Sequence, residues 1–340
     1  MMTLISKSFV LLLTSILSTT AEKLIIDTDA GGDDGVAILM LLRAEALNES
    51  PYEIVAITCT YGNTKEENVE NNVIRILSFA NRTDIPVYRG AKRPLLTVNF
   101  ATDNTYGKDG FGDSLPLLRS NVKKIESMHA SLAIIELTKK YERNVSIVML
   151  GPTTNVALAA SLDGNLVGRM KKFHVMGSSI AGRGNYKANV EFNFAADPEG
   201  NFILLSSTNS SQLTLFPWET AYNARIIKAW RIQILGKMTS PYMKFINAIE
   251  HVALNSPRKF YISADSLTVA TMLWPQIIKS SIETYVQAVT DGAARGSVLV
   301  EYRKSIERAN KPNARIIQSV DIALFKEAFT YYLTCVRVAC

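Results

Sequence analysis

Short runs of aliphatic and β-branched residues alternate along the chain with longer segments in which apolar positions recur at helical spacing. Such short apolar runs are typical of strands buried on both faces, and the periodic segments are typical of amphipathic helices. The runs predict strands at residues 24–27, 53–60, 145–150, 173–176, 213–216, 282–290, 297–303 and 315–320. The periodic segments predict helices at 34–46, 66–80 and 322–333, and a further helix that begins near Thr153.

Strands separated by helices predict an α/β fold with an open, mostly parallel, Rossmann-like sheet and helices on both faces. The chain has 340 residues, of which 47% are hydrophobic, and no repeat or low-complexity linker divides it. That length suits one α/β domain. In such sheets ligands bind beyond the carboxyl ends of the strands. Residues that follow strands are therefore the first place to look for function.

The N-terminus has the features of a signal peptide. Lys7 is followed by an apolar stretch over residues 9–17 and by small residues up to Ala21. This pattern predicts a cleaved segment at 1–21 and a secreted domain at 22–340, with a buried strand or an uncleaved anchor as the alternatives. No later run approaches the roughly eighteen apolar residues of a membrane span. Secretion fits four N-glycosylation sequons, at Asn48, Asn81, Asn144 and Asn209.

Charge and cysteine content exclude two further classes of protein. The net charge is +6, but Lys and Arg are scattered and not gathered with aromatic residues, which argues against a nucleic-acid groove. Three cysteines do not make a disulfide scaffold. Cys59 lies in an apolar run and is expected to be a buried thiol. Cys335 and Cys340 are close enough in sequence to pair.

An acidic loop follows the first predicted strand. Asp27, Asp29, Asp33 and Asp34 lie within eight residues, and unpaired carboxylates so close together repel one another. A helix dipole contributes only about 0.3–1 kcal/mol per charge, which is too little to offset the repulsion among four carboxylates. A bound divalent cation can offset it. The candidate ligands are hard oxygens without a Cys/His cluster, so the loop favours Ca²⁺ or Mg²⁺ over zinc.

Other loops of similar composition fit less well. An EF-hand beginning at Asp27 needs Glu at its twelfth position, where this chain has Ile38. A dinucleotide-binding loop needs G-x-G-x-x-G, which residues 31–35 do not supply, and the acids would repel a pyrophosphate. A solvated turn remains open, although the apolar strand before the loop makes it the weaker interpretation.

The segment LIIDTDAGGDDGVA, residues 24–37, resembles the N-terminal signature of the inosine–uridine-type nucleoside hydrolases. Further landmarks of that family follow in the same order, and the resemblance extends over residues 23–338. It implies the nucleoside hydrolase fold and cleavage of the N-glycosidic bond of ribonucleosides into base and ribose. The matching segments are TYGN at 60–63, LGPTTN at 150–155, MG at 176–177, Asn185, EFN at 191–193 and DPE at 197–199.

The resemblance also implies roles for individual residues. One Ca²⁺ would be held by Asp29, Asp34, the backbone carbonyl of Leu150 and Asp265. Asp29 would also be the general base, with Asn63 orienting it or the attacking water. A homo-dimer or homo-tetramer is expected. Substrate-binding positions are Asp33, Asn185, Glu191 and Asn193 for ribose, and Tyr106 and Trp218 for the base.

The chain departs from the family pattern at Ala264, where some members carry a histidine that protonates the departing base. His251 is the only plausible substitute, since His129 and His174 are expected far from the site or in the core. Other members activate purines by aromatic stacking, which predicts a preference for purine nucleosides. Candidate stacking residues are Tyr106, Phe111, Trp218, Tyr222 and Tyr261.

Two alternatives belong to other functional classes. Ala264 leaves room for a catalytically weakened protein that binds nucleosides on the same fold, although the intact acids at 29, 33, 34 and 265 argue against it. An N-terminal D-x-D also occurs in haloacid-dehalogenase-like phosphatases, where Asp27 would be the nucleophile. That hypothesis leaves the EFN segment unexplained.

Overall fold

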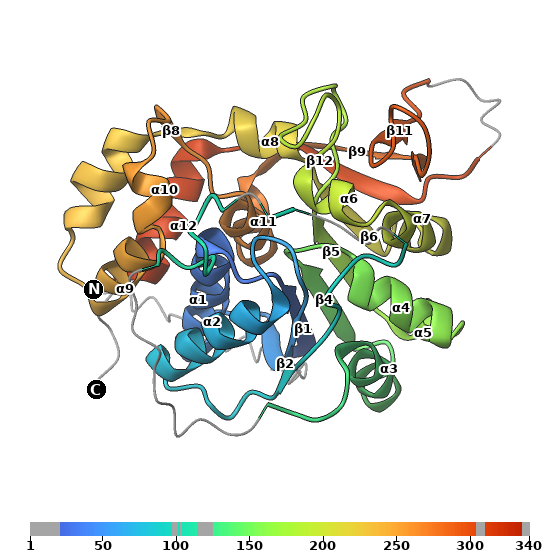
Figure 1. The fold of residues 1–340 in the computed structure, drawn as a ribbon, viewed down its shortest axis with the longest axis horizontal. Helices are drawn as coiled ribbons and strands as arrows, with labels where there is room; N and C mark the ends of the chain where they lie inside the picture. Colours follow the sequence, from blue (N-terminus) through green and yellow to red (C-terminus); the bar gives the residue numbers. More distant parts are fainter. Residues whose placement is uncertain (1–20, 97–100, 103, 114–124, 304–309, 335–340) are drawn as a thin grey trace, which may run out of the picture.

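The computed structural model describes residues 21–96, 101–102, 104–113, 125–303 and 310–334 (Figure 1). Its centre is an eight-stranded sheet in which every pair of neighbours is parallel except β12 and β9. The strands follow in the spatial order β3 (Val87–Tyr88), β2 (Tyr52–Cys59), β1 (Glu22–Thr28), β4 (Val145–Met149), β5 (Lys172–Met176), β6 (Leu213–Phe216), β12 (Ala314–Val320) and β9 (Ile278–Thr284).

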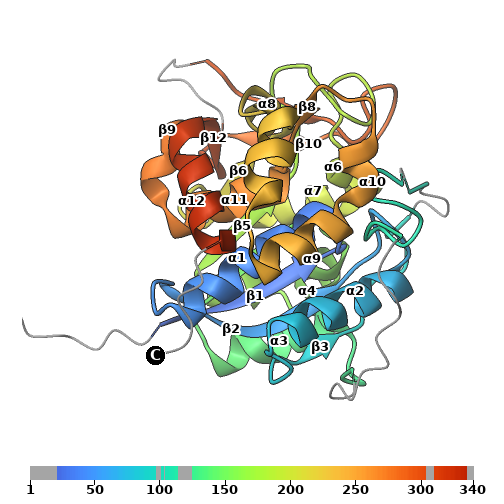
Figure 2. The ribbon, with the colours of Figure 1, turned by 90° about the vertical axis from the view of Figure 1, so that its left-hand side faces the viewer.

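Helices cover both faces of the sheet, as the alternation of strands and helices predicted (Figures 1 and 2). The first apolar cluster joins one face to α1 (Gly32–Ala46), α2 (Glu66–Phe79), α9 (Pro241–Ile249), α11 (Ala264–Leu273) and α12 (Ile322–Thr334). The second joins the other face to α3 (Ala130–Lys140), α4 (Thr154–Leu162), α5 (Leu166–Arg169) and α7 (Pro198–Ser207).

Burial on two sides explains the apolar strand composition. Leu24 and Ile26 of β1 pack into the first cluster, whereas Ile25 between them packs into the second. A strand whose alternate side chains both meet a helix layer has no solvent face, so its sequence is apolar throughout.

The predicted segment 282–290 is not one strand. The chain leaves the main sheet after Thr284, and Asn313 Oδ1 accepts the backbone N–H of Val286 at 2.8 Å. The N–H of Val286 is thus bound by a side chain and not by the backbone of the neighbouring strand, β12. The following residues form a separate antiparallel hairpin, β10 (Val286–Ala288) with β11 (Val298–Val300).

Short elements without a clear sequence signal fill the connections after the strands. They include a two-stranded pair that brings residues 226–227 beside residues 260–261. The short elements are α6 (Phe192–Ala196), α8 (Trp218–Asn223), β7 (Ile226–Ile227), the π-helix η1 (Trp230–Ile234), the 3₁₀ helices η2 (Leu235–Lys237) and η3 (Pro275–Ile277), α10 (His251–Asn255) and β8 (Phe260–Tyr261).

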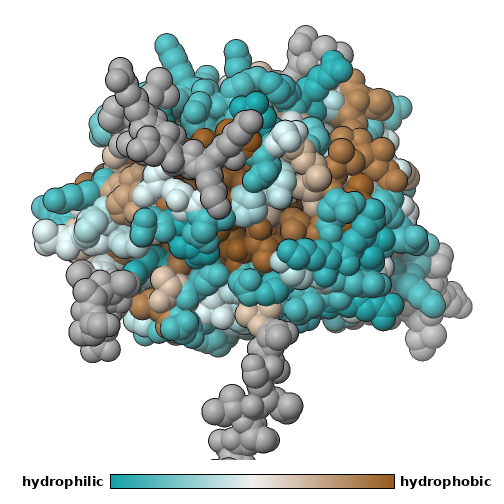
Figure 3. Space-filling model, turned by 90° about the horizontal axis from the view of Figure 1, so that it is seen from below, coloured by the Kyte–Doolittle hydropathy of each residue, from teal (hydrophilic) through white to brown (hydrophobic). Residues whose placement is uncertain are grey.

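Hydrophilic side chains cover most of the face seen in Figure 3, with hydrophobic ones gathered in its middle and at one edge. Among the described residues, no helix has the length and apolar content of a membrane span. Cys59 is a buried free thiol, as expected. The predicted signal segment up to residue 20, and Cys335 and Cys340, lie outside the described residues.

Candidate active site

Three carboxylates from two helices meet beyond the carboxyl end of β1. Asp33 and Asp34 lie in the first turn of α1, and Asp265 lies in the first turn of α11. Their oxygens lie within 4.8 Å of one another, and all three side chains are buried. Because α1 packs against α11, the fold brings together acids that are far apart in the sequence. Ser263, and not Asp265, is the N-cap residue of α11.

Asp29 follows β1 and is fully buried. The backbone N–H of Asn63 donates to its Oδ2 at 2.6 Å, and the side-chain amide of Asn63 donates to its Oδ1 at 3.1 Å. The same amide reaches Oδ2 of Asp34 at 3.2 Å. A Cβ at Gly62 would lie 2.0 Å from Asp29 Oδ2, so this approach requires glycine. Asn63 is therefore more than a turn residue: it orients two acids at once.

Asp33 and Asp34 are held by different donors. Thr28 Oγ1 and the backbone N–H of Gly31 donate to Asp34, at 2.5 and 2.9 Å. Asp33 accepts hydrogen bonds from the Tyr106 hydroxyl and from the backbone N–H of Ala264, the latter at 3.2 Å. Each carboxylate thus has a fixed orientation before any ligand arrives.

Asp27, the first acid of the motif, does not take part in the cluster. Thr58 Oγ1 and Asn155 Nδ2 donate to its Oδ1 at 2.5 and 2.8 Å, and the side chain is fully buried. It is absent from the residues that line the cavity described below. A phosphatase mechanism with Asp27 as the nucleophile is therefore wrong for this chain.

Residues 185–193 supply a second group of polar side chains. Glu191 is buried and caps α6, where its two oxygens accept the backbone N–H groups of Asn193 and Phe194 at 2.8 and 3.0 Å. Asn193 Nδ2 donates to the carbonyl of Leu150 at 2.7 Å. Asn185 Oδ1 accepts the backbone N–H of Phe192 at 2.8 Å. These contacts leave Asn193 Oδ1 and Asn185 Nδ2 for other partners, and a merely surface-exposed Glu191 is excluded.

Burial dominates the electrostatics of the four clustered acids. It raises the pKa of Asp33 to about 7, and it raises the pKa of Asp29 and Asp265 well above the usual range. The charge on Asp34 adds to this effect for Asp29 and Asp33, and burial raises the pKa of Asp34 as well. No ion pair among the described residues involves any of the four. The cluster needs bound protons or a cation.

The donor set fits a hard divalent cation. Ca²⁺ and Mg²⁺ prefer carboxylate and carbonyl oxygens, which Asp29, Asp34, Asp265 and the Leu150 backbone provide. No histidine or cysteine belongs to the cluster of acids found among the described residues. Carboxylates that repel one another in a buried place gain most from such an ion.

A cavity opens beside the acids, between the segments that carry α6 and α10, which lie on either side of α11 in Figure 1. Its lining contains most of the residues predicted from the sequence. The predicted residues that line it are Asp33, Asn63, Tyr106, Leu150, Asn185, Glu191, Asn193, Trp218 and Asp265, and Ala264 and Tyr261 line it too.

Other candidates lie elsewhere. Phe111 is fully buried in the first apolar cluster, and Tyr222 contacts Trp218, Arg183 and Arg225 without lining the cavity. His251 is exposed at the start of α10 and is also absent from the lining. Hence the substitution of His251 for the missing acid at Ala264 has no support.

The remaining histidines have structural positions, as expected. His129 caps α3, where its ring accepts the backbone N–H of Ser131. His174 lies in β5, and burial lowers its pKa to about 4.

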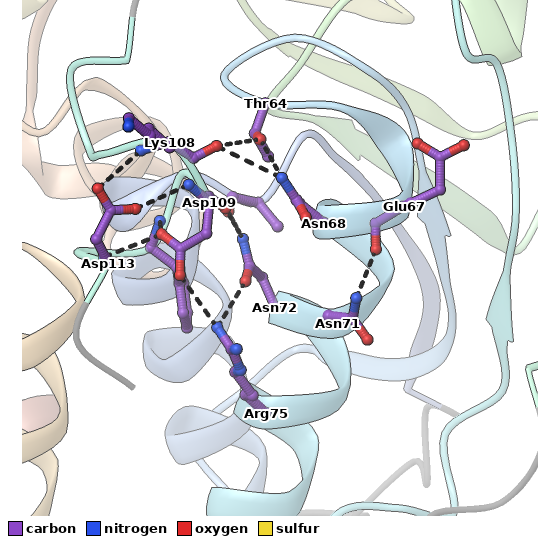
Figure 4. A network of polar contacts seen from close by, with 11 residues as sticks. Thr64, Glu67, Asn68, Asn71, Asn72, Arg75, Lys108, Asp109 and Asp113 are labelled. Carbon is purple, nitrogen blue, oxygen red and sulfur yellow. Dashed lines mark hydrogen bonds and ion pairs between the residues drawn. The ribbon is translucent and has the colours of Figure 1, made fainter. Parts of the chain in front are cut away.

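The loop after Tyr106 is hydrogen-bonded to Thr64 and to α2, and Figure 4 shows these contacts at Lys108 and Asp109. Thr64 Oγ1 donates to the carbonyl of Lys108 at 3.0 Å, and Asn72 Nδ2 donates to the carbonyl of Asp109 at 2.8 Å. Within the loop, Asp113 accepts the backbone N–H groups of Lys108 and Asp109. The loop therefore holds the Tyr106 hydroxyl against Asp33.

Sequence reasoning missed Lys228, Arg258 and Phe260, which also line the cavity. They come from the segments around β7 and β8, and their proximity depends on the antiparallel pairing of Ile227 with Phe260. Two-residue strands give no periodic signal, so the sequence alone could not have placed these residues at the site.

Comparisons with known proteins agree with this geometry. Residues 24–327 match the family model described as inosine-uridine preferring nucleoside hydrolase. The pyrimidine-specific ribonucleoside hydrolase RihA of Escherichia coli is 29% identical over 317 residues, which cover 88% of this chain and 94% of the relative. RihA of Klebsiella pneumoniae is 29% identical over 320 residues, which cover 91% and 96%.

Solved structures show the same architecture. A structure described as an inosine-guanosine nucleoside hydrolase has a TM-score of 0.84 and 27% identity, covering 93% of this chain and 99% of its own. A plant nucleoside hydrolase has a TM-score of 0.82 over the same shares, at 24% identity. The single α/β domain is thus the nucleoside hydrolase fold. The chain belongs to the inosine-uridine preferring nucleoside hydrolase family and is a nucleoside hydrolase, a glycosidase acting on ribonucleosides.

Proposed function

We propose that this enzyme hydrolyses purine ribonucleosides in a Ca²⁺-dependent reaction. The observation that carries the proposal is the group of three buried carboxylates, Asp33, Asp34 and Asp265, with the buried Asp29 beside them, next to a cavity lined by amide and aromatic side chains. Asp29, Asp34, Asp265 and the Leu150 carbonyl would hold the ion. When bound, Ca²⁺ lowers the pKa of water and offers positions for hydroxyl ligands.

Asp29 is the general base in this proposal. The two hydrogen bonds from Asn63 fix its carboxylate, so it is held ready to take the proton of the attacking water.

The ribose hydroxyls would meet the polar residues of the cavity. Asp33 has a fixed orientation through Tyr106 and can accept from a hydroxyl. Asn185 keeps an N–H donor and Asn193 keeps an amide oxygen, because their other groups bind the protein. Glu191, which caps α6, holds this segment in place. Together these groups would orient the sugar so that its C1′ faces the base.

Aromatic residues support the preference for purines. Trp218, Tyr106 and Tyr261 line the cavity, and a bicyclic purine offers a larger face to aromatic rings than a pyrimidine does. Ala264 supplies no acid, so a purine that can be activated through its own N7 is the better leaving group. Relatives differ here: RihA is described as pyrimidine-specific and the solved structure as an inosine-guanosine enzyme.

Secretion, with removal of residues 1–21 and glycosylation, is a further part of the proposal. Asn48, Asn81 and Asn209 are exposed, as a glycan acceptor must be, whereas Asn144 is half-buried. Expression in a eukaryotic secretory host should yield a protein in the medium that begins at Glu22 and loses mass on treatment with an N-glycosidase. Retention in the cell with Met1 intact would contradict this.

We also propose that the enzyme is a homo-dimer or homo-tetramer. Large apolar side chains are exposed along the segment between α8 and α9, which fits contact with another subunit: Ile227, Ile232, Ile234 and Met238. Sedimentation velocity on the secreted protein would measure the mass, and a monomer at micromolar concentration would contradict the assignment.

The decisive experiment measures release of base and reducing sugar from inosine, guanosine, adenosine, uridine and cytidine, with 2′-deoxyinosine alongside. Ribonucleosides should be cleaved, purines fastest. The deoxy substrate should react roughly 5- to 150-fold more slowly, because it lacks the hydroxyl that would donate to a buried acceptor such as Asp33, and that hydrogen bond is worth about 1–3 kcal/mol. Equal rates on inosine and 2′-deoxyinosine would rule out recognition of the ribose 2′-hydroxyl by these residues. Tight nucleoside binding without turnover would instead favour a weakened nucleoside-binding protein.

A further inference from the structure

The cavity lining contains charged residues of both signs. The acids Asp33, Asp265 and Glu191 lie at the starts of α1, α11 and α6, where the ribose would bind. Lys228 and Arg258, from the segments around β7 and β8, are the cationic residues of the lining in the described chain. If these acids bind the sugar, the base of the nucleoside lies against the rest of the lining, which includes Lys228 and Arg258.

Lys228 already binds three acceptor atoms of the segment at residues 253–256. Its ammonium donates to the carbonyls of Ser256 and Ala253, at 2.7 and 3.2 Å, and to Ser256 Oγ at 3.0 Å. An ammonium has three N–H groups, so all of them are in use. A donor group of a ligand that approached these oxygens would meet a buried positive charge, since Lys228 is only 8% exposed.

Glu250, which binds the lining residue Tyr261, already has partners within the protein as well. Glu250 is buried, and it accepts from Arg231 Nε and Nη2 at 3.0 and 2.7 Å and from the Tyr261 hydroxyl at 2.7 Å. It does not line the cavity. Glu250 is therefore not available to accept from an exocyclic amino group on a base.

Arg258 is the opposite case. It lines the cavity, its side chain is exposed, and no acceptor in the described part of the chain binds its guanidinium. A guanidinium has five N–H donors and no acceptor, in a planar fork. That fork matches the carbonyl oxygen and N7 on one edge of a 6-oxopurine, the same pairing by which arginine reads guanine in DNA. Adenine presents an amino donor at the position of that oxygen.

We propose that Arg258 recognises the carbonyl oxygen of the base and makes the enzyme selective for oxo bases over amino bases. Inosine and guanosine are then preferred to adenosine, and uridine to cytidine. The inference rests on the proposed function and adds to it the chemical class of the base and the residue that selects it.

The test compares kcat/KM on four substrates for the wild type, Arg258→Gln and the matched control Lys259→Gln. Lys259 is the exposed neighbour, carries the same charge and does not line the cavity. The wild type should favour inosine over adenosine and uridine over cytidine. Arg258→Gln should reduce both ratios about 10- to 100-fold, as expected for a charge-assisted hydrogen bond, and Lys259→Gln should leave them within about twofold.

The outcomes separate this inference from the proposed function. A wild type that cleaves the four substrates equally, or favours adenosine and cytidine, overturns the role of Arg258 but leaves the hydrolase intact. Unchanged ratios in Arg258→Gln do the same. Failure to cleave any ribonucleoside overturns the proposed function itself. Equal melting temperatures of the three proteins would establish that altered ratios do not reflect unfolding, and hypoxanthine should inhibit the wild type more strongly than adenine.

Discussion

At the scale of single residues, the site is defined by which hydrogen-bonding groups the protein has already used. Asn193 has committed its amide N–H groups to the carbonyls of Leu150 and Met176, so only its oxygen remains. Asn185 has committed its oxygen, so only its N–H groups remain. Both oxygens of Asp29 accept a hydrogen bond from Asn63, and the carboxylate also contacts Asp34. Asn193 can therefore only accept a hydrogen bond from a hydroxyl of the substrate, and Asn185 can only donate one.

Asp29→Asn tests the general base. Asparagine can keep the hydrogen bond from the Asn63 backbone but cannot accept a proton at neutral pH. Turnover on inosine should fall by a factor on the order of 10² or more, with Ca²⁺ binding and melting temperature measured on the same preparation. Asp291→Asn removes a charge from an exposed turn residue and should leave turnover unchanged. Near wild-type turnover of Asp29→Asn would exclude Asp29 as the base.

At the scale of elements, α2 supports the site without contributing a ligand to it. Asn72 is buried, and its amide donates to the carbonyls of Ala30 and Asp109 at 3.0 and 2.8 Å (Figure 4). Ala30 has φ of 38°, a left-handed conformation that is costly for alanine. Asn72 thus secures both the strained acidic loop and the loop that carries Tyr106.

Asn72→Ala should therefore destabilise the protein by about 1–3 kcal/mol, because the buried carbonyl of Ala30 and the partly buried carbonyl of Asp109 lose a donor. Asn71→Ala is the matched control: Asn71 is the next residue on the same helix, is exposed, and bonds only to the carbonyl of Glu67. Its effect should stay within about 0.5 kcal/mol. Urea unfolding of both variants measures their free energies of unfolding. Equal values would show that the hydrogen bonds of Asn72 do not stabilise the protein.

The elements also show how far the sequence could predict the structure. The apolar runs located β1, β2, β4, β5, β6 and β12, because strands covered on both faces leave a continuous apolar signal. Motifs located the acids, whose place after strands is fixed by topology. The hydrogen bond of Tyr106 to Asp33, the cap formed by Glu191 and the approach of Arg258 were not predictable. They depend on irregular segments, where tertiary contacts and not periodicity decide the path.

At the scale of the whole molecule, a bound cation should couple activity to stability. Four buried acids from α1, α11 and the loop after β1 cannot all stay charged at low cost. Chelation should abolish nucleoside cleavage and lower the melting temperature, and added Ca²⁺ should restore both. The shift should grow with the logarithm of free Ca²⁺, as for any ligand that binds only the folded state. Full activity in protein shown to be metal-free would contradict the proposal that these acids bind a catalytic cation.

A second effect on the whole molecule comes from acids outside the site. Glu66 and Glu70 lie one turn apart on α2 and are both buried, and their neighbours include Cys59, Arg89 and Lys92. Burial, followed by the hydrogen bond and charge of Glu70, raises the pKa of Glu66 to about 8 from an ordinary value of 4.5. Between these two values the folded protein retains a proton that the unfolded chain releases.

The sign of the pH dependence follows from this difference. A group whose pKa is raised by folding contributes stability that is fully present below its unfolded pKa and is lost as pH rises through the folded value. Wild-type stability should therefore decline between about pH 4.5 and 8 relative to Glu66→Gln, which has no proton to lose. Melting temperatures at saturating Ca²⁺ would measure the difference. Glu67→Gln provides the opposite case, because Lys92 lowers the pKa of the exposed Glu67 and its contribution is lost in acid. A wild type and a Glu66→Gln variant with parallel profiles over this range would show that the Glu66 carboxyl holds no proton in the folded enzyme.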